Sequence, residues 1–272
     1  MKSTLRVRGV DVFVEGPGTD TEVDTIVMVH GWPDTGRLWD GTVAALRPHW
    51  RCVRFTWPGF DIDQPRRAYS LDQMVETLHA IVEATSPDRP VVLMAHDWGC
   101  LFGYEWAMRH PQRVQRIVGI DIGDAGSGAH ARALTGKAKA MIFAYQAWLA
   151  LAWVVSSASR TLADRMTRWM ARQLRCPADA RFIGAHMNFP YFIQWTGRHG
   201  SYRHKQRFDA PVPMLFVFGT RKPFMFHSSA WADELAARPG SAVVPMKTGH
   251  WVMNNDPEGF NRVVQGWLEE RR

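Results

Sequence analysis

The chain has 272 residues, a length that fits one large domain or a domain carrying an insertion. Its hydrophobic content of 46%, with 13 Trp and 14 Phe, predicts a globular protein rather than a disordered one. The net charge is +7, but the basic residues are scattered and no nucleic-acid motif accompanies them, so we expect no nucleic-acid partner. Three widely spaced cysteines and an N-terminus without an apolar signal segment predict reduced thiols and a cytoplasmic location.

Strands alternate with helices from residue 25 to residue 121, which predicts βαβ units and a parallel sheet. Ser70, followed three residues later by Gln73, predicts a capping box at the start of one of these helices. Asp256 and Pro257 are typical of the start of the last helix. The other predicted elements are strands at 5–15 (two, around Gly9), 25–29, 52–55, 91–94, 116–121, 213–218 and 242–246, and helices at 37–46 and 101–110.

A tight turn connects the buried strand 91–94 to the helix that begins after Gly99. The sequence of this turn is small-x-acid-x-small, with Ala95 and Gly99 as the small residues and Asp97 between them. A nucleophile on a strand-to-helix turn needs small residues at these two positions, because the helix packs back against the strand. The alternative is that Asp97 is an ordinary N-capping residue. The pattern favours Asp97 as a presented nucleophile.

Residues 125–208 interrupt the alternation of strands and helices. The stretch 140–159 has no charged residue and is long enough for a membrane span, but its serines favour an apolar helix that faces a substrate cavity. The following helix, around 162–174, carries four arginines beside an apolar face. We interpret these arginines as solvated and regard docking of this insertion on a membrane or a partner as the less favoured alternative.

The order of these motifs resembles the α/β-hydrolase fold across nearly the whole chain. His-Gly-Trp-Pro-Asp at 30–34 and His-Asp-Trp-Gly at 96–99, with a late Gly-His at 249–250, are similar to the epoxide hydrolase and haloalkane dehalogenase branch. The resemblance implies a mostly parallel eight-stranded sheet flanked by helices, with a helical cap inserted after strand 6. We predict a core domain formed by residues 1–124 and 209–272 and a cap domain at 125–208.

The resemblance also implies roles for individual residues. Asp97 matches the nucleophile, and a carboxylate suits displacement at an sp³ carbon with formation of a covalent alkyl ester. His250 matches the histidine that activates water to hydrolyse this ester. The backbone N–H groups of Trp32 and Trp98 match the oxyanion hole, and His30 matches a structural histidine that supports the oxyanion loop.

The third member of the predicted triad departs from the pattern of the family. Relatives commonly have Asp after the seventh strand, where this chain has Lys222. Asp121, at the end of the sixth strand, matches the acid that some haloalkane dehalogenases use, and Asp124 is the alternative. Without an orienting carboxylate, His250 would work poorly, so a non-catalytic ligand-binding protein stays a possible interpretation.

The electrophile is left open between two classes. Epoxide hydrolases use cap tyrosines to protonate the ring oxygen, and the predicted cap contains Tyr145, Tyr191 and Tyr202. The aromatic surroundings of Tyr145 and Tyr191 favour these two. Dehalogenases of the closest type usually have Asn where this chain has Trp32, although Trp98 could bind a halide. We therefore predict a hydrolase that opens a small apolar epoxide, with haloalkane dehalogenation as the alternative and with neither cofactor nor metal.

Overall fold

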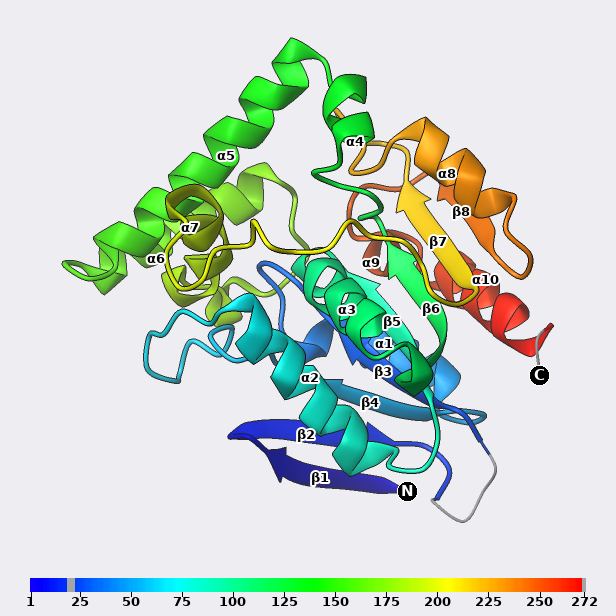
Figure 1. Cartoon of the computed structure of the whole chain (residues 1–272). Helices are drawn as coiled ribbons and strands as arrows, with labels where there is room; N and C mark the ends of the chain where they lie inside the picture. Colours follow the sequence, from blue (N-terminus) through cyan, green and yellow to red (C-terminus); the bar gives the residue numbers. More distant parts are fainter. Residues whose placement is uncertain (19–22, 271–272) are drawn as a thin grey trace.

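An eight-stranded sheet forms the centre of the molecule (Figure 1). The computed structural model describes residues 1–18 and 23–270. The strand order is β1-β2-β4-β3-β5-β6-β7-β8, with β2 antiparallel to both of its neighbours and the strands from β4 to β8 parallel. The strands are β1 (Lys2–Val7), β2 (Val10–Glu15), β3 (Thr25–Val29), β4 (Arg51–Phe55), β5 (Val91–His96), β6 (Val114–Ile120), β7 (Met214–Gly219) and β8 (Ala242–Met246).

Helices cover both faces of the sheet, and each face has its own apolar core. One core contains residues of α2, α3 and α8, and the other contains residues of α1, α9 and α10. The capping box predicted at Ser70 and Gln73 is present at the start of α2. The helices are α1 (Asp40–Leu46), α2 (Leu71–Thr85), α3 (Trp98–Arg109), α8 (Ser229–Ala236), α9 (Val252–Asn255) and α10 (Pro257–Glu269).

Both faces of the central strands are buried, which explains their continuous apolar sequence. Every residue of β3 and of β5 is buried, as expected for parallel strands covered by helices on both sides. The carboxyl ends of these parallel strands share one edge of the sheet. Ligands bind at this edge in open α/β folds, so the turns that follow β3, β5, β6, β7 and β8 form the expected site.

The cap is inserted after β6, as the sequence predicts, and lies beyond the carboxyl ends of the strands (Figure 1). The predicted α/β-hydrolase architecture is thus confirmed, whereas the domain boundaries at 124/125 and 208/209 stay a prediction. The elements of the cap are α4 (Gly128–Ala133), α5 (Gly136–Val155), α6 (Arg160–Gln173), the short 3₁₀ turns Ala180–Phe182 and Ala185–Asn188, and α7 (Phe189–Thr196).

Helix α5, which the sequence predicts to be an apolar helix that faces a substrate cavity, buries only part of its apolar surface. Its buried residues are Ala138, Leu149, Ala152 and Trp153. Much of the remaining apolar surface is open to solvent, because α5 packs mainly on α6, α7 and the turn between them. In the described part of the chain, α5 is the single helix long and apolar enough to cross a membrane. The cytoplasmic location stays a prediction.

Candidate active site

The turn after β5 presents Asp97 in a conformation that few side chains adopt. The backbone of Asp97 has φ 53° and ψ −127°, a strained combination for a residue with a Cβ. A Cβ at Gly99 would lie 2.6 Å from the carbonyl oxygens of Val29 and His30, and one at Gly31 would lie 2.4 Å from Oδ1 of Asp97. Glycine at both positions therefore allows β3, the turn and α3 to approach closely around the Asp97 carboxylate.

Two backbone N–H groups donate hydrogen bonds to this carboxylate. The N–H of Trp32 lies 2.6 Å from Oδ1 of Asp97, and the N–H of Trp98 also donates to the carboxylate. Both groups are fixed in place, one by the turn after β3 and the other by the first turn of α3. The two N–H groups predicted for an oxyanion hole thus meet at the side chain predicted to be the nucleophile.

His250 lies between two carboxylates. Its Nε2 is 3.4 Å from Oδ2 of Asp97, and its Nδ1 is 2.5 Å from Oδ2 of Asp121. Asp97 follows β5, Asp121 follows β6 and His250 follows β8, so strand order brings together residues that are far apart in the sequence. The carboxylate that contacts Nδ1 of His250 is the one at the end of β6, the position predicted for the acid.

Lys222 occupies the other side of Asp121. Its Nζ forms an ion pair with Oδ1 of Asp121, and the N–H of Gly219 donates to the same oxygen at 3.0 Å. Both Lys222 and Asp121 have buried side chains. The residue that replaces the usual acid after β7 is therefore the partner of the acid after β6.

The alternative acid, Asp124, is held away from His250. Its oxygens accept from the N–H and Oγ of Ser228, at 2.7 and 2.8 Å, and from Oγ of Ser127 at 2.6 Å. These bonds attach the start of the cap to the start of α8. The geometry gives Asp124 a structural position and leaves Asp121 as the carboxylate that contacts the histidine.

These contacts change the protonation of all three groups. Burial alone would lower the pKa of His250, but the charges and hydrogen bonds of Asp121 and Asp97 raise it to about 9. Burial alone would raise the pKa of Asp121, but Lys222 and then His250 bring it down to about 2. Burial also opposes ionisation of Asp97, yet its bond with His250 holds its pKa below the ordinary value. In the resting site, both carboxylates are ionised and His250 is a cation near neutral pH.

Two cap tyrosines lie over this site. The rings of Tyr145 on α5 and Tyr191 on α7 have centroids 6.1 Å apart, and Tyr191 also contacts Trp32 and Trp98 edge-to-face. Burial and the charge of Asp97 raise the pKa of both phenols. Each hydroxyl thus keeps its proton and remains available as a donor.

Two indole groups near Asp97 already have partners within the protein. Trp98 forms a side-chain hydrogen bond with Tyr191. The Nε1–H of Trp32 donates to Oδ1 of Asn188 at 2.8 Å, and Asn188 in turn donates to Thr167 on α6. The indole N–H of Trp32 is therefore not free to bind a halide in this arrangement.

Sequence reasoning missed three residues that support the site. Asn188 fixes Trp32 as described above, and buried Asp34 accepts from Nε1 of Trp251, the neighbour of His250, at 2.8 Å. His96 lies against His250 with ring centroids 4.5 Å apart, and burial lowers the pKa of His96 to about 3. Asp34 is the last residue of the motif at 30–34, and His96 directly precedes the nucleophile. The two motifs therefore pointed to Asp34 and His96 as residues near the site. Asn188 had no such signal.

His30 occupies the structural position that the resemblance implies. Its Nε2 accepts from the N–H of Trp57 at 3.0 Å, so Nδ1 carries the proton and faces the carbonyl oxygen of Gly31. Burial lowers the pKa of His30 to about 4, and the ring is therefore neutral. These bonds connect the turn after β3 to the loop after β4.

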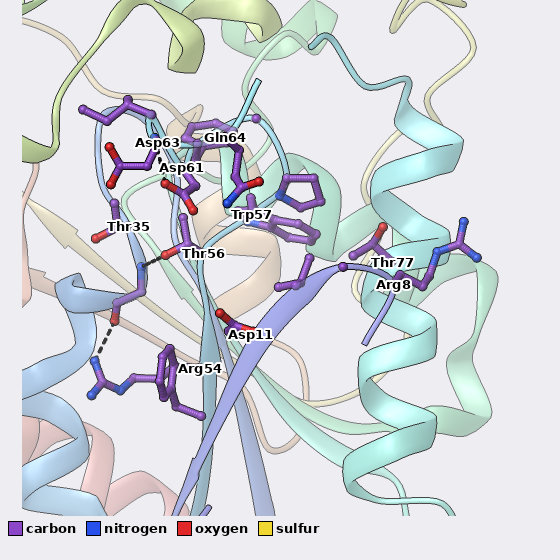
Figure 2. Close-up of a pocket in the computed structure, with 18 of the residues that line it drawn as sticks. Arg8, Asp11, Thr35, Arg54, Thr56, Trp57, Asp61, Asp63, Gln64 and Thr77 are labelled. Carbon is purple, nitrogen blue, oxygen red and sulfur yellow. Dashed lines mark hydrogen bonds between the residues drawn. The ribbon is translucent and has the colours of Figure 1, made fainter. Parts of the chain in front are cut away.

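One open cleft on the described surface contains none of the candidate catalytic residues (Figure 2). It has a volume of about 910 Å³ and lies between the edge strands and the loop after β4. Thr35, Thr56, Asp61 and Asp63 gather at one end of it (Figure 2). Its lining mixes polar, apolar and charged residues of both signs and includes none of the candidate catalytic residues, so we place the site at the Asp97 turn and not in this cleft.

Comparison with known proteins identifies the class to which this fold and site belong. A family model described as alpha/beta hydrolase fold matches residues 24–257. The chain belongs to the α/β-hydrolase fold family.

Individual similar proteins indicate the branch of the α/β-hydrolase fold family to which this chain is most similar. A cis-3-alkyl-4-alkyloxetan-2-one decarboxylase from Xanthomonas campestris is 34% identical over 113 residues, 38% of this chain and 37% of that protein. Epoxide hydrolase 1 from Caenorhabditis elegans is 21% identical over 98% of this chain and 70% of that protein. An epoxide hydrolase structure from Bacillus megaterium has a TM-score of 0.72 at 18% identity, covering 98% of this chain and 100% of that one. Haloalkane dehalogenases also occur among the similar proteins. The resemblance to this branch is confirmed, while the first of these matches spans well under two thirds of its relative's length.

Proposed function

We propose that this protein is a hydrolase that opens apolar epoxides through a covalent ester on Asp97. The observation that carries the proposal is the contact of one carboxylate with two oxyanion-type N–H groups and with a histidine that is backed by a second carboxylate. Two phenols over the same carboxylate support an epoxide as the electrophile, because a ring oxygen needs a proton when its bond to carbon breaks.

The proposed first step uses the two oxygens of Asp97 differently. Oδ1 accepts from the N–H of Trp32, so Oδ2, which faces His250, attacks the epoxide carbon. The new bond joins Oδ2 to this carbon, the carbon–oxygen bond of the ring breaks, and the ring oxygen takes a proton from Tyr191 or Tyr145. The product of this step is a hydroxyalkyl ester of Asp97.

The second step needs a neutral His250. Formation of the ester removes the negative charge of Asp97, and this charge is one of the causes that raise the pKa of His250. The pKa of the histidine therefore falls once the ester exists, so its Nε2 proton can pass to the phenolate that the first step left. Neutral Nε2 can then take a proton from water. The resulting hydroxide attacks the ester carbonyl carbon, and the N–H groups of Trp32 and Trp98 stabilise the negative oxygen. The bond between this carbon and Oδ2 then breaks, Oδ2 takes the proton back from Nε2 of His250, and the diol leaves.

The substrate class is tested with a matched panel of apolar electrophiles. We expect diol formation from alkyl and aryl epoxides and little halide release from bromoalkanes of the same size. An oxetan-2-one with alkyl substituents belongs in the panel, since one relative bears the name of an enzyme acting on such a ring. Halide release without any epoxide turnover would favour the dehalogenase alternative instead.

Loss of either phenol should slow epoxide opening. Tyr191→Phe and Tyr145→Phe are each expected to reduce kcat/KM for an epoxide by on the order of 10²-fold, because the leaving oxygen loses a proton donor. Tyr202→Phe is the matched control: Tyr202 is a buried cap tyrosine whose hydroxyl has no partner among the described residues. Unchanged kinetics in both Tyr191→Phe and Tyr145→Phe would argue against an epoxide.

Lys222 should set the pH at which ester hydrolysis begins. The negative charge of Asp121 stabilises the imidazolium form of His250. The positive charge of Lys222 offsets part of this negative charge. Lys222→Met removes this offset, so the pKa of His250 should rise, and the acid limb of the kcat profile should move to higher pH by on the order of one unit. Lys222→Arg keeps the charge and should keep the profile close to that of the wild type. Identical profiles for Lys222→Met and the wild type would separate Lys222 from the chemistry.

A further inference from the structure

From residue 140 onward, helix α5 presents an uncharged face to solvent. No charged residue occurs from residue 140 to residue 159, and only 22% of the most apolar part of this helix is buried. Phe143, Leu151 and Val154 are about half exposed, at 56%, 51% and 49%. A surface helix normally has polar residues on its outer side. After Lys139, α5 exposes no charged side chain, so this part of its outer side is suited to an apolar partner.

The apolar surface continues onto the neighbouring cap helices. Phe143 contacts Trp195 of α7 with ring centroids 5.1 Å apart, and Trp148 contacts Trp169 of α6 at the same distance. Of the ten large hydrophobic side chains exposed in the described residues, eight lie between residues 125 and 208. We call seven of these the cap face: Met141, Phe143, Leu151, Val154, Leu162, Trp169 and Trp195.

The cap is also where the positive charge of the protein is concentrated. Residues 125–208 contain 13 Lys and Arg against 2 Asp and no Glu, whereas the rest of the chain contains 20 Lys and Arg against 24 Asp and Glu. The formal charge is therefore +11 on the cap and −4 on the remainder. The net charge of +7 for the whole chain is thus the sum of a strongly basic cap and a weakly acidic remainder.

Some of these charges lie within the apolar surface itself. On the exposed side of α6, Leu162, Arg165, Trp169 and Arg172 follow one another at helical spacing of three and four residues. Neither arginine forms an ion pair with any residue that the structure describes. Apolar aromatic groups and unpaired arginines thus share one surface.

We propose that the cap face docks on the surface of a membrane that contains anionic lipids. Exposed Trp, Phe and Leu together with Arg are the composition of helices that lie in the membrane interface, where aromatic rings sit among headgroups and arginines pair with lipid phosphates. A second copy of the chain is disfavoured as the occupant, because pairing two caps would bring together two surfaces of charge +11. The sequence alone favours solvated arginines, and the exposed face of α5 is what changes this interpretation.

Docking leaves α5 in the cap and does not turn it into a membrane span. Leu149, Ala152 and Trp153 bury the inner side of α5, and the same helix carries Tyr145 over the candidate site. Only the outer side is free for lipid. The docking proposal is independent of the reaction at Asp97, so each can fail without the other.

Vesicle flotation tests the proposal on the intact chain. We expect the protein to float with vesicles of phosphatidylcholine and phosphatidylglycerol, to bind vesicles of phosphatidylcholine alone much more weakly, and to detach as salt rises to about 1 M. Phe143→Ser with Trp195→Ser should weaken binding about tenfold or more, because the lost side chains no longer enter the interface. Arg165→Gln with Arg172→Gln should weaken binding to the anionic vesicles by on the order of tenfold.

Matched variants outside the cap distinguish docking through the cap face from nonspecific adsorption of the protein to vesicles. Phe13→Ser removes an exposed aromatic side chain from β2, and Lys247→Gln with Arg262→Gln removes two exposed charges outside the cap. These variants should bind vesicles like the wild type. Vesicle binding that both cap variants retain in full would overturn the proposal. So would absence of vesicle binding together with a dimer, measured by sedimentation, that Phe143→Ser with Trp195→Ser dissociates.

Discussion

Replacing His250 with Gln is expected to trap the protein as a covalent ester on Asp97. Formation of the ester needs the carboxylate and a phenol, whereas its hydrolysis needs a base at Nε2 of His250, 3.4 Å from Asp97. The steady-state kcat should fall by on the order of 10⁴-fold or more. Mass spectrometry of the peptide that contains Asp97 should show an increase equal to the mass of one epoxide.

Two further measurements decide whether this ester is an intermediate. Asp97→Asn combined with His250→Gln should show no adduct, because the nucleophile is absent. A single turnover of the wild type in ¹⁸O-labelled water should place the label in the carboxylate of Asp97, since water attacks the ester carbonyl carbon and not the substrate carbon. Label found in the diol alone would exclude the alkyl-ester mechanism.

Asp121→Asn should have the second largest effect on turnover. The carboxylate of Asp121 contacts Nδ1 of His250 at 2.5 Å, where it holds the ring in place and stabilises its cationic form. An amide cannot stabilise the cation and favours the wrong tautomer, so kcat should fall by about 10⁴-fold. Steady-state kinetics on an epoxide measure this loss.

The buried ion pair with Lys222 requires a control for stability. Asp121→Asn alone leaves Lys222 as a buried cation without its carboxylate, so this variant should also unfold at a lower temperature. Adding Lys222→Met removes the cation and should restore much of the thermal stability while leaving kcat low. If kcat recovers together with stability, Asp121 acts in folding and not in the reaction. If Asp121→Asn keeps full turnover, the triad proposed here lacks its acid.

Local sequence patterns were sufficient to predict the Asp97 turn. The requirement for glycine at residue 99 is steric and short-range, because a Cβ there would meet the backbone of β3. The capping box at Ser70 is equally local. Alternation of buried strands with amphipathic helices likewise predicts the parallel sheet, and the sheet order then places Asp97, Asp121 and His250 at a common edge.

The choice of acid could be narrowed but not made from the sequence. Lys222 and Asp121 are 101 residues apart, and the sequence presented them as a missing acid and a candidate replacement. Only the pairing of β6 with β7 shows that the two side chains form one buried ion pair behind His250. Contacts of this kind depend on which strands are neighbours, and no local periodicity encodes them.

The cap is the part of the protein where the properties determined by sequence differ most clearly from those decided by tertiary structure. By itself, the sequence determined that an uncharged helix and a basic helix follow strand 6, and that tyrosines lie among them. Whether an apolar side of a helix is buried or exposed depends on how many neighbours pack around it. The structure gives α5 neighbours on one side only. That arrangement places Tyr145 on the inner side of α5, where it lies with Tyr191 over Asp97. The opposite side of the same helix has no neighbour to bury it and therefore forms part of the exposed cap face.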